Sequence, residues 1–285
     1  MSTAQSLIDD VRARIVEANA DFFSDDVSIL RWLNQGYRNF VLQSECLDKV
    51  KGFAIVANQY EYSTPADCLD IQQIRWKDQY FVRQRDLEEF ARISGFNDST
   101  SDRPRYYTMF PAQSKIRLYE IPNTTSVTTT VNGSHNSSTT TITVASAASF
   151  PSRGRILIGT EQILYYAKTA TTFLQCVRGD GETTAASHTT ADVVTDLPMT
   201  MMYAYSPVAM TTGGSAIDCQ LPAEYDEAII AYATAICFRV KDKYEIASQY
   251  NKTYKEILDV AIAATAEQQR DRKPCIKDDS EWENS

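Results

Sequence analysis

Leu221-Pro222-Ala223-Glu224-Tyr225 opens the stretch that decides the fold, a predicted helical pair that continues to Arg270. Proline suits the first helical position because its missing N–H has no intrahelical partner there, and Glu224 suits the positive end of the helix dipole. A polar corner at Lys241-Asp242-Lys243 separates two runs of apolar residues at helical spacing. The runs are Tyr225, Ile229, Tyr232, Ile236 and Val240, then Ala247, Tyr250, Tyr254, Ile257, Leu258, Ala261 and Ala264. Because the connection is short, the two helices should be antiparallel neighbours.

The second predicted helix outlasts the first by several turns. Its end, Glu267 to Lys273, has too few apolar residues to pack against the same core, and Pro274 ends the helix. Two interpretations of this end stay open: an ordinary core hairpin with a frayed last turn, or a helix that projects toward a partner.

The first 50 residues predict two further helices, each with one apolar face. Ser24 is a suitable N-cap for the second, and Asp25 and Asp26 favour the positive end of its dipole. The apolar stripes of the first and last thirds of the chain must meet to be buried. We therefore predict one helical bundle with the core residues Leu30, Leu33, Tyr37, Ile229, Tyr232, Ile236 and Ile257.

Between the helical thirds, the apolar pattern changes to the period of β-strands. Short alternating runs separated by turns occupy residues 51–122, with one short helix from Asp86 to Ser94. At Asn123 the composition shifts to Thr, Ser, Asn and Gly, which is typical of a linker. Strand-like runs from Ile142 to Thr195, punctuated by glycines, then indicate a small all-β module inserted into a host domain.

The predicted fold class is α+β. N-terminal helices and a long C-terminal helical hairpin form a bundle, which carries a small antiparallel β extension with an inserted small all-β module. The predicted parts are residues 1–50, the N-terminal helices; 51–122, the β extension with a short helix; 123–197, the Thr/Ser-rich linker and inserted β module; 198–219, a returning strand and loop; 220–273, the helical hairpin; and 274–285, the C-terminal tail.

Composition limits the function classes. The chain has 285 residues, is 43% hydrophobic and carries a net charge of −9. Such an acidic chain lacks the basic face that grips nucleic acid through phosphates, although DNA can pass nearby without being held. Six scattered cysteines without a CxxC pair indicate idle thiols. Neither a signal peptide nor a bilayer-spanning segment is expected.

Few residues are suited to catalysis. His135 lies in the predicted linker, and His188 has no second histidine nearby, so hydrogen bonding within the module is favoured over catalysis for His188. Arg178-Gly179-Asp180 spells an adhesion tripeptide, but its glycine and aspartate also suit a β-turn, which is the favoured interpretation. GxSxG, HExxH and phosphate-loop motifs are not found in the sequence. We therefore expect no enzyme, no metal site and no cofactor.

Several motifs resemble phage head–tail adaptor proteins, which form the connector ring beneath the portal of tailed double-stranded DNA phages. The motifs are Asp26 to Arg38, the corner Tyr62 to Leu69, Arg103 to Tyr107, Ile116 to Pro122, and Leu221 to Tyr225. Thr64 and Cys68 depart from the pattern of the corner, which usually has leucine and an aromatic residue there.

The segment Ile142 to Val194 resembles a small β module found in phage virion proteins. Its matching residues are Phe150-Pro151-Ser152, Gly154, Ile156, Ile158, Gly159, Glu161, Ile163, Tyr165, Arg178-Gly179, Thr183-Thr184-Ala185 and His188.

The resemblance implies a structural virion protein of the neck that is assembled in the host cytoplasm. It implies a homo-oligomeric ring of twelve subunits with a portal protein above and a tail or nozzle protein below. Duplex DNA would pass through the channel of this ring without tight binding, and neither catalysis nor a membrane partner is implied. Two other function classes stay open: a receptor- or glycan-binding protein that uses the β module, and an enzyme, which the scarcity of catalytic groups opposes.

The C-terminal tail, residues 274–285, is nearly all polar, and its large apolar residues are Ile276 and Trp282. Adaptors of the resembled kind attach through their C-terminal segment. We therefore expect the tail to bind the portal, with Trp282 in a pocket and with Asp278 and Glu281 facing basic portal groups. The alternative is a solvated acidic tail.

Overall fold

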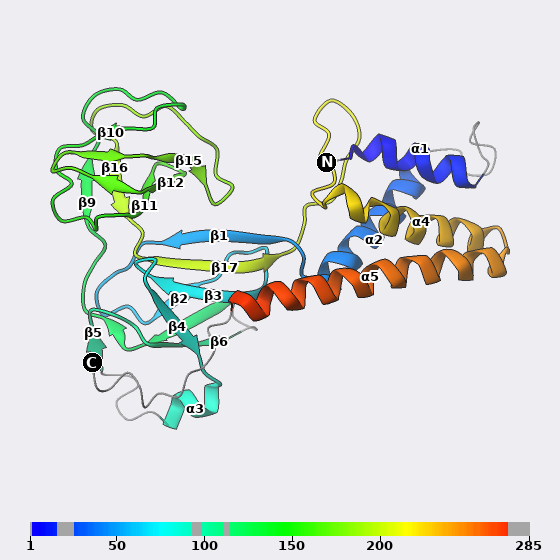
Figure 1. Ribbon diagram of the computed structural model, residues 1–285, viewed down its shortest axis with the longest axis horizontal. Helices are drawn as coiled ribbons and strands as arrows, with labels where there is room; N and C mark the ends of the chain where they lie inside the picture. The colour runs from blue at the N-terminus through cyan, green and yellow to red at the C-terminus, as the bar shows by residue number, and fades with distance from the viewer. Residues whose placement is uncertain (1, 16–25, 93–98, 111–113, 273–285) are drawn as a thin grey trace. The chain divides into compact units, whose positions relative to one another are not determined.

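The computed structural model describes residues 2–15, 26–92, 99–110 and 114–272 (Figure 1). The chain forms two compact units. The helical unit comprises Met1–Asp48 and Ala204–Ser285, and the sheet unit comprises Lys49–Tyr203. The chain crosses between the units twice, within strand β1 (Asp48–Phe53) and within strand β17 (Met199–Tyr205).

The predicted fold class, a helical bundle with a small β extension, is wrong. The described residues contain seventeen strands in four sheets and only five α-helices. The largest sheet has seven strands in the order β1-β17-β3-β4-β6-β7-β2. Its other strands are β2 (Glu61–Ser63), β3 (Cys68–Trp76), β4 (Tyr80–Gln84), β6 (Tyr106–Phe110) and β7 (Lys115–Tyr119).

The error has a physical cause. Local periodicity predicts strands and hairpins, but it does not show that β17 lies between β1 and β3, which precede it by more than one hundred residues. This long-range pairing joins the short runs into one large sheet with its own core. The buried apolar side chains of that core are Ile55, Tyr62, Ile71, Ile74, Trp76, Val82, Tyr107, Ile116, Leu118, Met199 and Met201.

Two small elements lie beside the large sheet. Helix α3 (Leu87–Arg92) follows β4, and strand β5 (Thr100–Ser101) pairs in parallel with β8 (Ile121–Pro122). Helix α3 has Glu88 and Glu89 in its first turn and Arg92 in its last, so its charges complement the helix dipole.

The inserted module has two sheets of its own, in the orders β15-β12-β11-β16-β9 and β10-β14-β13. Its strands are β9 (Thr128–Thr130), β10 (Ile142–Thr143), β11 (Gly154–Ile158), β12 (Glu161–Tyr165), β13 (Ala167–Lys168), β14 (Thr172–Leu174), β15 (Val177–Asp180) and β16 (Val193–Asp196). Strand β9 comes from the Thr/Ser-rich stretch whose composition predicts a linker. A separate apolar core, which includes Ile156, Ile163, Tyr165 and Phe173, fills the module.

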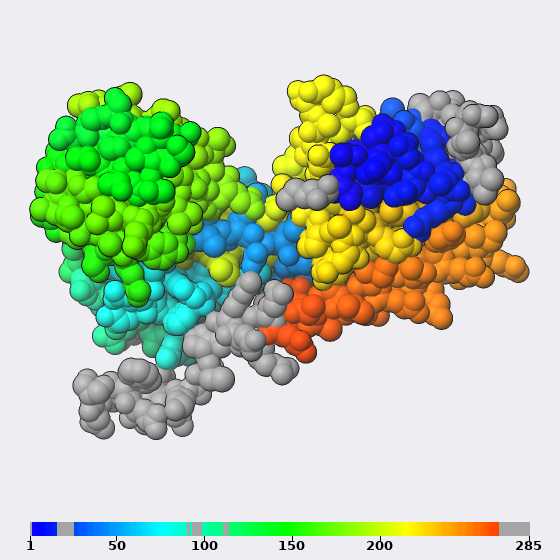
Figure 2. All heavy atoms as spheres, turned by 45° about the horizontal axis from the view of Figure 1, so that its top comes forward, coloured from blue at the N-terminus to red at the C-terminus, as the bar shows by residue number. Residues whose placement is uncertain are grey.

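Polar contacts join the module to the large sheet. The Arg155 Nη1 atom lies 2.8 Å from both carboxylate oxygens of Asp78, which is in the turn after β3. The Gly52 N–H donates to Oε1 of Gln162 at 2.5 Å. In Figure 2 the module, in green, rests on the cyan segments of the sheet. The module is therefore compact but firmly bound within the sheet unit.

The helical unit contains the predicted helical pair. Its elements are α1 (Ala4–Arg14), α2 (Asp26–Ser44), a 3₁₀ turn (Ala223–Tyr225), α4 (Asp226–Val240) and α5 (Tyr244–Arg272). Helices α4 and α5 run side by side and antiparallel (Figure 1). Aromatic side chains join three helices: the ring centroids of Phe40 and Tyr254 are 6.4 Å apart, and those of Tyr232 and Tyr254 are 5.2 Å apart.

The seven predicted bundle-core residues all lie in helices of this unit and differ in burial. Leu33, Tyr37 and Ile229 are fully buried. Leu30, Tyr232, Ile236 and Ile257 are half-buried.

Candidate interaction surfaces

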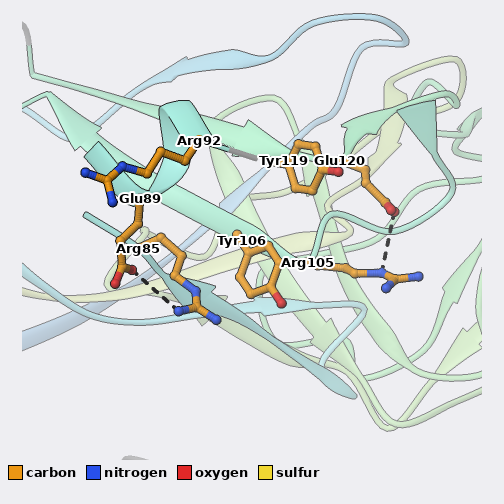
Figure 3. Close-up of a pocket in the computed structure, with 7 residues that line it drawn as sticks. All are labelled: Arg85, Glu89, Arg92, Arg105, Tyr106, Tyr119 and Glu120. Atoms are coloured by element: carbon orange, nitrogen blue, oxygen red, sulfur yellow. Dashed lines mark hydrogen bonds and ion pairs between the residues drawn. The ribbon is translucent and has the colours of Figure 1, made fainter. Parts of the chain in front are cut away.

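The sheet unit has a hollow of about 490 Å³ between α3 and the ends of β4, β6 and β7. Arginine and tyrosine side chains dominate its wall (Figure 3). The lining residues are Arg85, Glu89, Arg92, Arg105, Tyr106, Tyr119 and Glu120. We refer to this hollow as the Arg–Tyr pocket.

The strand register builds the aromatic wall of the Arg–Tyr pocket. Tyr106 of β6 is directly opposite Tyr119 of β7, so the two rings stack with centroids 6.2 Å apart and planes 16° apart. The guanidinium of Arg85 lies 4.9 Å from the Tyr106 ring centroid. A hydrogen bond with Tyr106 raises the pKa of Arg85, which therefore stays charged.

The arginines of the pocket already have carboxylate neighbours. The closest N–O distances are 3.4 Å for Arg85 to Glu89 and 3.6 Å for Arg105 to Glu120. Arg92 pairs with Glu88 at 2.5 Å, and both of these side chains are more than three-quarters exposed. Exposed ion pairs such as Arg92–Glu88 contribute only about 0–1 kcal/mol. The pocket thus combines cationic groups with a stacked pair of tyrosine rings.

The module contains a buried ion cluster around Glu161 of β12. Arg178 donates to both oxygens of Glu161 at 2.8 Å, and Nε2 of His188 lies 2.7 Å from Oε2. Burial raises the pKa of Glu161, but the bonds from Arg178, from two backbone N–H groups and from His188 outweigh it and lower the pKa to about 2. The prediction that His188 makes hydrogen bonds within the module is confirmed.

The adhesion tripeptide does not form the predicted turn. Residues 178–180 belong to strand β15, and Gly179 has a φ of +67°. The Arg178 side chain is only 6% exposed because it binds Glu161, and Asp180 binds Nε of Arg155 at 2.6 Å. The arginine is therefore not available to an adhesion receptor. His135, in turn, pairs with His188 across a β-bridge and accepts a hydrogen bond from Thr143 N–H.

A second charged cluster lies where the module meets the large sheet. Arg155 binds both Asp78 and Asp180, and Lys49 lies 3.2 Å from both Asp67 and Glu182. Near Arg155, Asp196 is only 5% exposed. Burial raises the pKa of Asp196 to about 6. Lys77 and a hydrogen bond from the Leu197 N–H partly oppose this rise, and Asp78 adds a smaller rise.

The predicted portal-binding residues Ile276, Asp278, Glu281 and Trp282 lie outside the described residues. Over the part of the chain that the structure describes, no group of three or more His, Cys, Asp or Glu side chains could hold a metal ion. Among the described helices, none is long and apolar enough to cross a membrane.

Sequence reasoning did not identify the Arg–Tyr pocket. Its local signal was the segment Arg103-Pro104-Arg105-Tyr106-Tyr107, which combines arginine and tyrosine at the start of β6. The segment alone does not predict the pocket, because the contribution of α3 and β7 to the same hollow depends on tertiary packing.

The chain is similar to one known family along nearly its whole length. A family model described as SU10 adaptor protein matches residues 2–275, which includes the inserted module. No curated protein matches the chain. The chain therefore belongs to the SU10 adaptor protein family, and it is a virion-associated structural protein of the phage adaptor type.

Proposed function

We propose that this protein is a head–tail adaptor that forms a ring of twelve subunits beneath the portal and joins the capsid to the tail. The observation that carries the proposal is the family match over residues 2–275. In this role the protein binds a portal protein on one side and a tail or nozzle protein on the other. It has no catalytic activity, and it works in the neck of the virion after assembly in the host cytoplasm.

The distribution of charge supports passage of DNA through the ring. The helical unit carries 22 acidic and 13 basic side chains, whereas the sheet unit carries 15 of each. The whole net charge of −9 thus belongs to the helical unit. If this unit lines the channel, its wall repels phosphates, and duplex DNA slides through without being held.

Two experiments test the proposal. Electron microscopy and native mass spectrometry of the purified protein, alone and mixed with portal-bearing heads, should reveal a ring that attaches to the portal. A subunit that stays monomeric in both samples would contradict the ring. Titration with duplex DNA should show weak binding, so tight, salt-dependent binding would contradict the channel.

The receptor-binding alternative has less support. That alternative rests on the β module, in which the arginine of the adhesion tripeptide 178–180 is buried against Glu161. A receptor-binding protein would also bind host cells as a purified monomer, which a head–tail adaptor would not.

A further inference from the structure

Helix α2 has an exposed basic face. Val27, Arg31, Gln35, Arg38 and Leu42 follow one another at spacings of three or four residues, and all five are exposed. Arg31 and Arg38 are the charged residues of α2 after Asp26, and neither forms an ion pair with any residue that the structure describes. Val27 and Leu42, at the two ends of this face, are 69% and 42% exposed.

This basic face points away from the core of the helical unit. The buried side of α2 carries Leu33, Tyr37 and Phe40. A helix advances 100° per residue, so residues 31, 35 and 38 lie on the side opposite these three. The basic face is therefore exposed to solvent in the described part of the helical unit.

Helix α5 has an exposed acidic face. Glu256, Asp259, Val260, Ala263 and Glu267 are all exposed, and Val260 is 65% exposed. No lysine or arginine occurs between Glu256 and Glu267. Asp259 and Glu267 form no ion pair with a described residue, and Glu256 has only a long contact of 3.7 Å with Lys252.

The acidic face also points away from the core. Tyr254, Leu258 and Ala261 form the buried side of α5. By the same helical geometry, Glu256, Val260, Ala263 and Glu267 lie opposite them. The basic face of α2 and the acidic face of α5 thus lie on outward sides of helices that share one core.

We propose that the basic face of α2 in one subunit packs against the acidic face of α5 in the next subunit. The occupant is a second copy of this chain, because the two faces have opposite charge and each combines charged with apolar side chains. Their charge spacings also match. Arg31 and Arg38 are separated by about 10 Å along α2, and Asp259 and Glu267 by about 12 Å along α5.

The contact is head-to-tail, because each subunit offers one face to each neighbour. Such a heterologous contact leaves one free face at each end of a chain of subunits, and it closes when the rotation per subunit completes a ring. The inference rests on the proposed function, because it names the surfaces that build the proposed ring. Exposed charge pairs are screened by salt, so the contact should weaken at high ionic strength.

Charge reversal tests the contact. One variant carries Arg31→Glu and Arg38→Glu, a second carries Asp259→Arg and Glu267→Arg, and a third carries all four changes. Arg153→Glu is the control, because Arg153 is an exposed arginine of the sheet unit that lies outside both faces and outside the Arg–Tyr pocket. Thermal melting first establishes that each variant folds, and native mass spectrometry and electron microscopy then give the subunit number, alone and on portal-bearing heads.

We expect rings for the wild type and the control, loss of rings for each two-site variant, and their recovery in the four-site variant. Rings in both two-site variants would overturn the inference, and so would a folded four-site variant that forms no rings. Neither result would contradict the ring of the wild-type protein. If the variant with Arg31→Glu and Arg38→Glu kept its rings but lost portal attachment, the basic face would be assigned to the portal. That result would also overturn the inference. A wild type without rings in either sample would instead contradict the proposed function.

Discussion

Gly36 of α2 lies against the ring of Tyr232 in α4, so closely that a Cβ atom at residue 36 would be 2.8 Å from Cδ1 of the tyrosine. The Cβ of Tyr232 would be only 3.0 Å away, and this atom cannot swing aside as a side-chain tip can. The absence of a side chain at residue 36 therefore sets the distance between the two helices. The side-chain Nδ2 of Asn39, on the same helix as Gly36, donates a hydrogen bond to the Tyr232 hydroxyl at 3.2 Å.

Gly36→Val should destabilise the helical unit. Adding a side chain to a filled core costs about 1–3 kcal/mol, and valine brings little gain in helix propensity to offset this cost. We expect a lower free energy of unfolding in urea. Gln43→Val is the matched control, because residue 43 is exposed on the same helix. Equal stabilities of the two variants would show that α2 and α4 can move apart without cost.

The helical hairpin shows how far sequence reasoning reaches. Its helices could be predicted because Tyr225, Ile229 and Tyr254 recur at a local period that belongs to each helix alone. The large sheet could not be predicted in the same way. Strand β17 contributes Met199 and Met201 to the sheet core, but its neighbours β1 and β3 come from the other side of the inserted module. Strand pairing over such distances leaves no periodic signal in the sequence.

Asp196→Asn should change the pH dependence of stability. The pKa of Asp196 is raised to about 6 in the folded protein, above its ordinary value of 3.8, so the folded state holds this proton more tightly than the unfolded state. The stability that comes from the proton is present below pH 3.8 and is lost as the pH rises through 6. Asparagine keeps an acceptor oxygen and carries no charge.

Relative to the wild type, the Asn variant should therefore gain about 2.5 kcal/mol between pH 4 and pH 8. Urea unfolding at several pH values measures this difference. Asp192→Asn is the control, because the Asp192 side chain is 42% exposed. A difference between variant and wild type that stays constant with pH would contradict the raised pKa.

Glu161→Gln should destabilise the module and remove part of its acid sensitivity. The pKa of Glu161 is lowered to about 2, so its contribution is present above its ordinary value of 4.5 and is lost as the pH falls through 2. Glutamine leaves the buried Arg178 charge without a counter-charge, which costs about 3–5 kcal/mol.

Tryptophan fluorescence does not report on the module, because no tryptophan lies in residues 123–197. Amide hydrogen exchange is therefore the measurement, and faster exchange in β11 and β12 is the expected result. Glu182→Gln is the control, because the Glu182 side chain is 51% exposed in its pair with Lys49. Unchanged exchange in Glu161→Gln would show that the ion cluster contributes little to the module.

Some features of the candidate surfaces can be predicted from the sequence, and others depend on the folded structure. The acidic excess of the last third of the chain is a property of composition, which the sequence alone reveals. The Arg–Tyr pocket depends on the pairing of Tyr106 with Tyr119 and on the position of α3, which only the folded sheet determines. The unpaired state of Arg31 and Arg38 among the described residues depends likewise on which carboxylates the fold places near them.

The C-terminal tail, residues 274–285, should anchor the ring to the portal. Deleting residues 276–285 should abolish attachment of the ring to portal-bearing heads while the ring itself persists, because the tail lies outside the proposed contact between α2 and α5. Trp282→Ala should weaken attachment as well. Truncating a buried interface tryptophan costs about 2–4 kcal/mol, and a ring repeats this loss at every subunit.

Deleting Asn284 and Ser285 alone is the control, because it leaves Ile276, Asp278, Glu281 and Trp282 in place. Co-sedimentation with portal-bearing heads measures attachment, and native mass spectrometry confirms the ring. Full attachment of the long deletion would assign the tail to solvent and portal binding to another surface. Loss in the long deletion but not in Trp282→Ala would keep the tail as the anchor and shift its main contact to Ile276 or to the acidic residues.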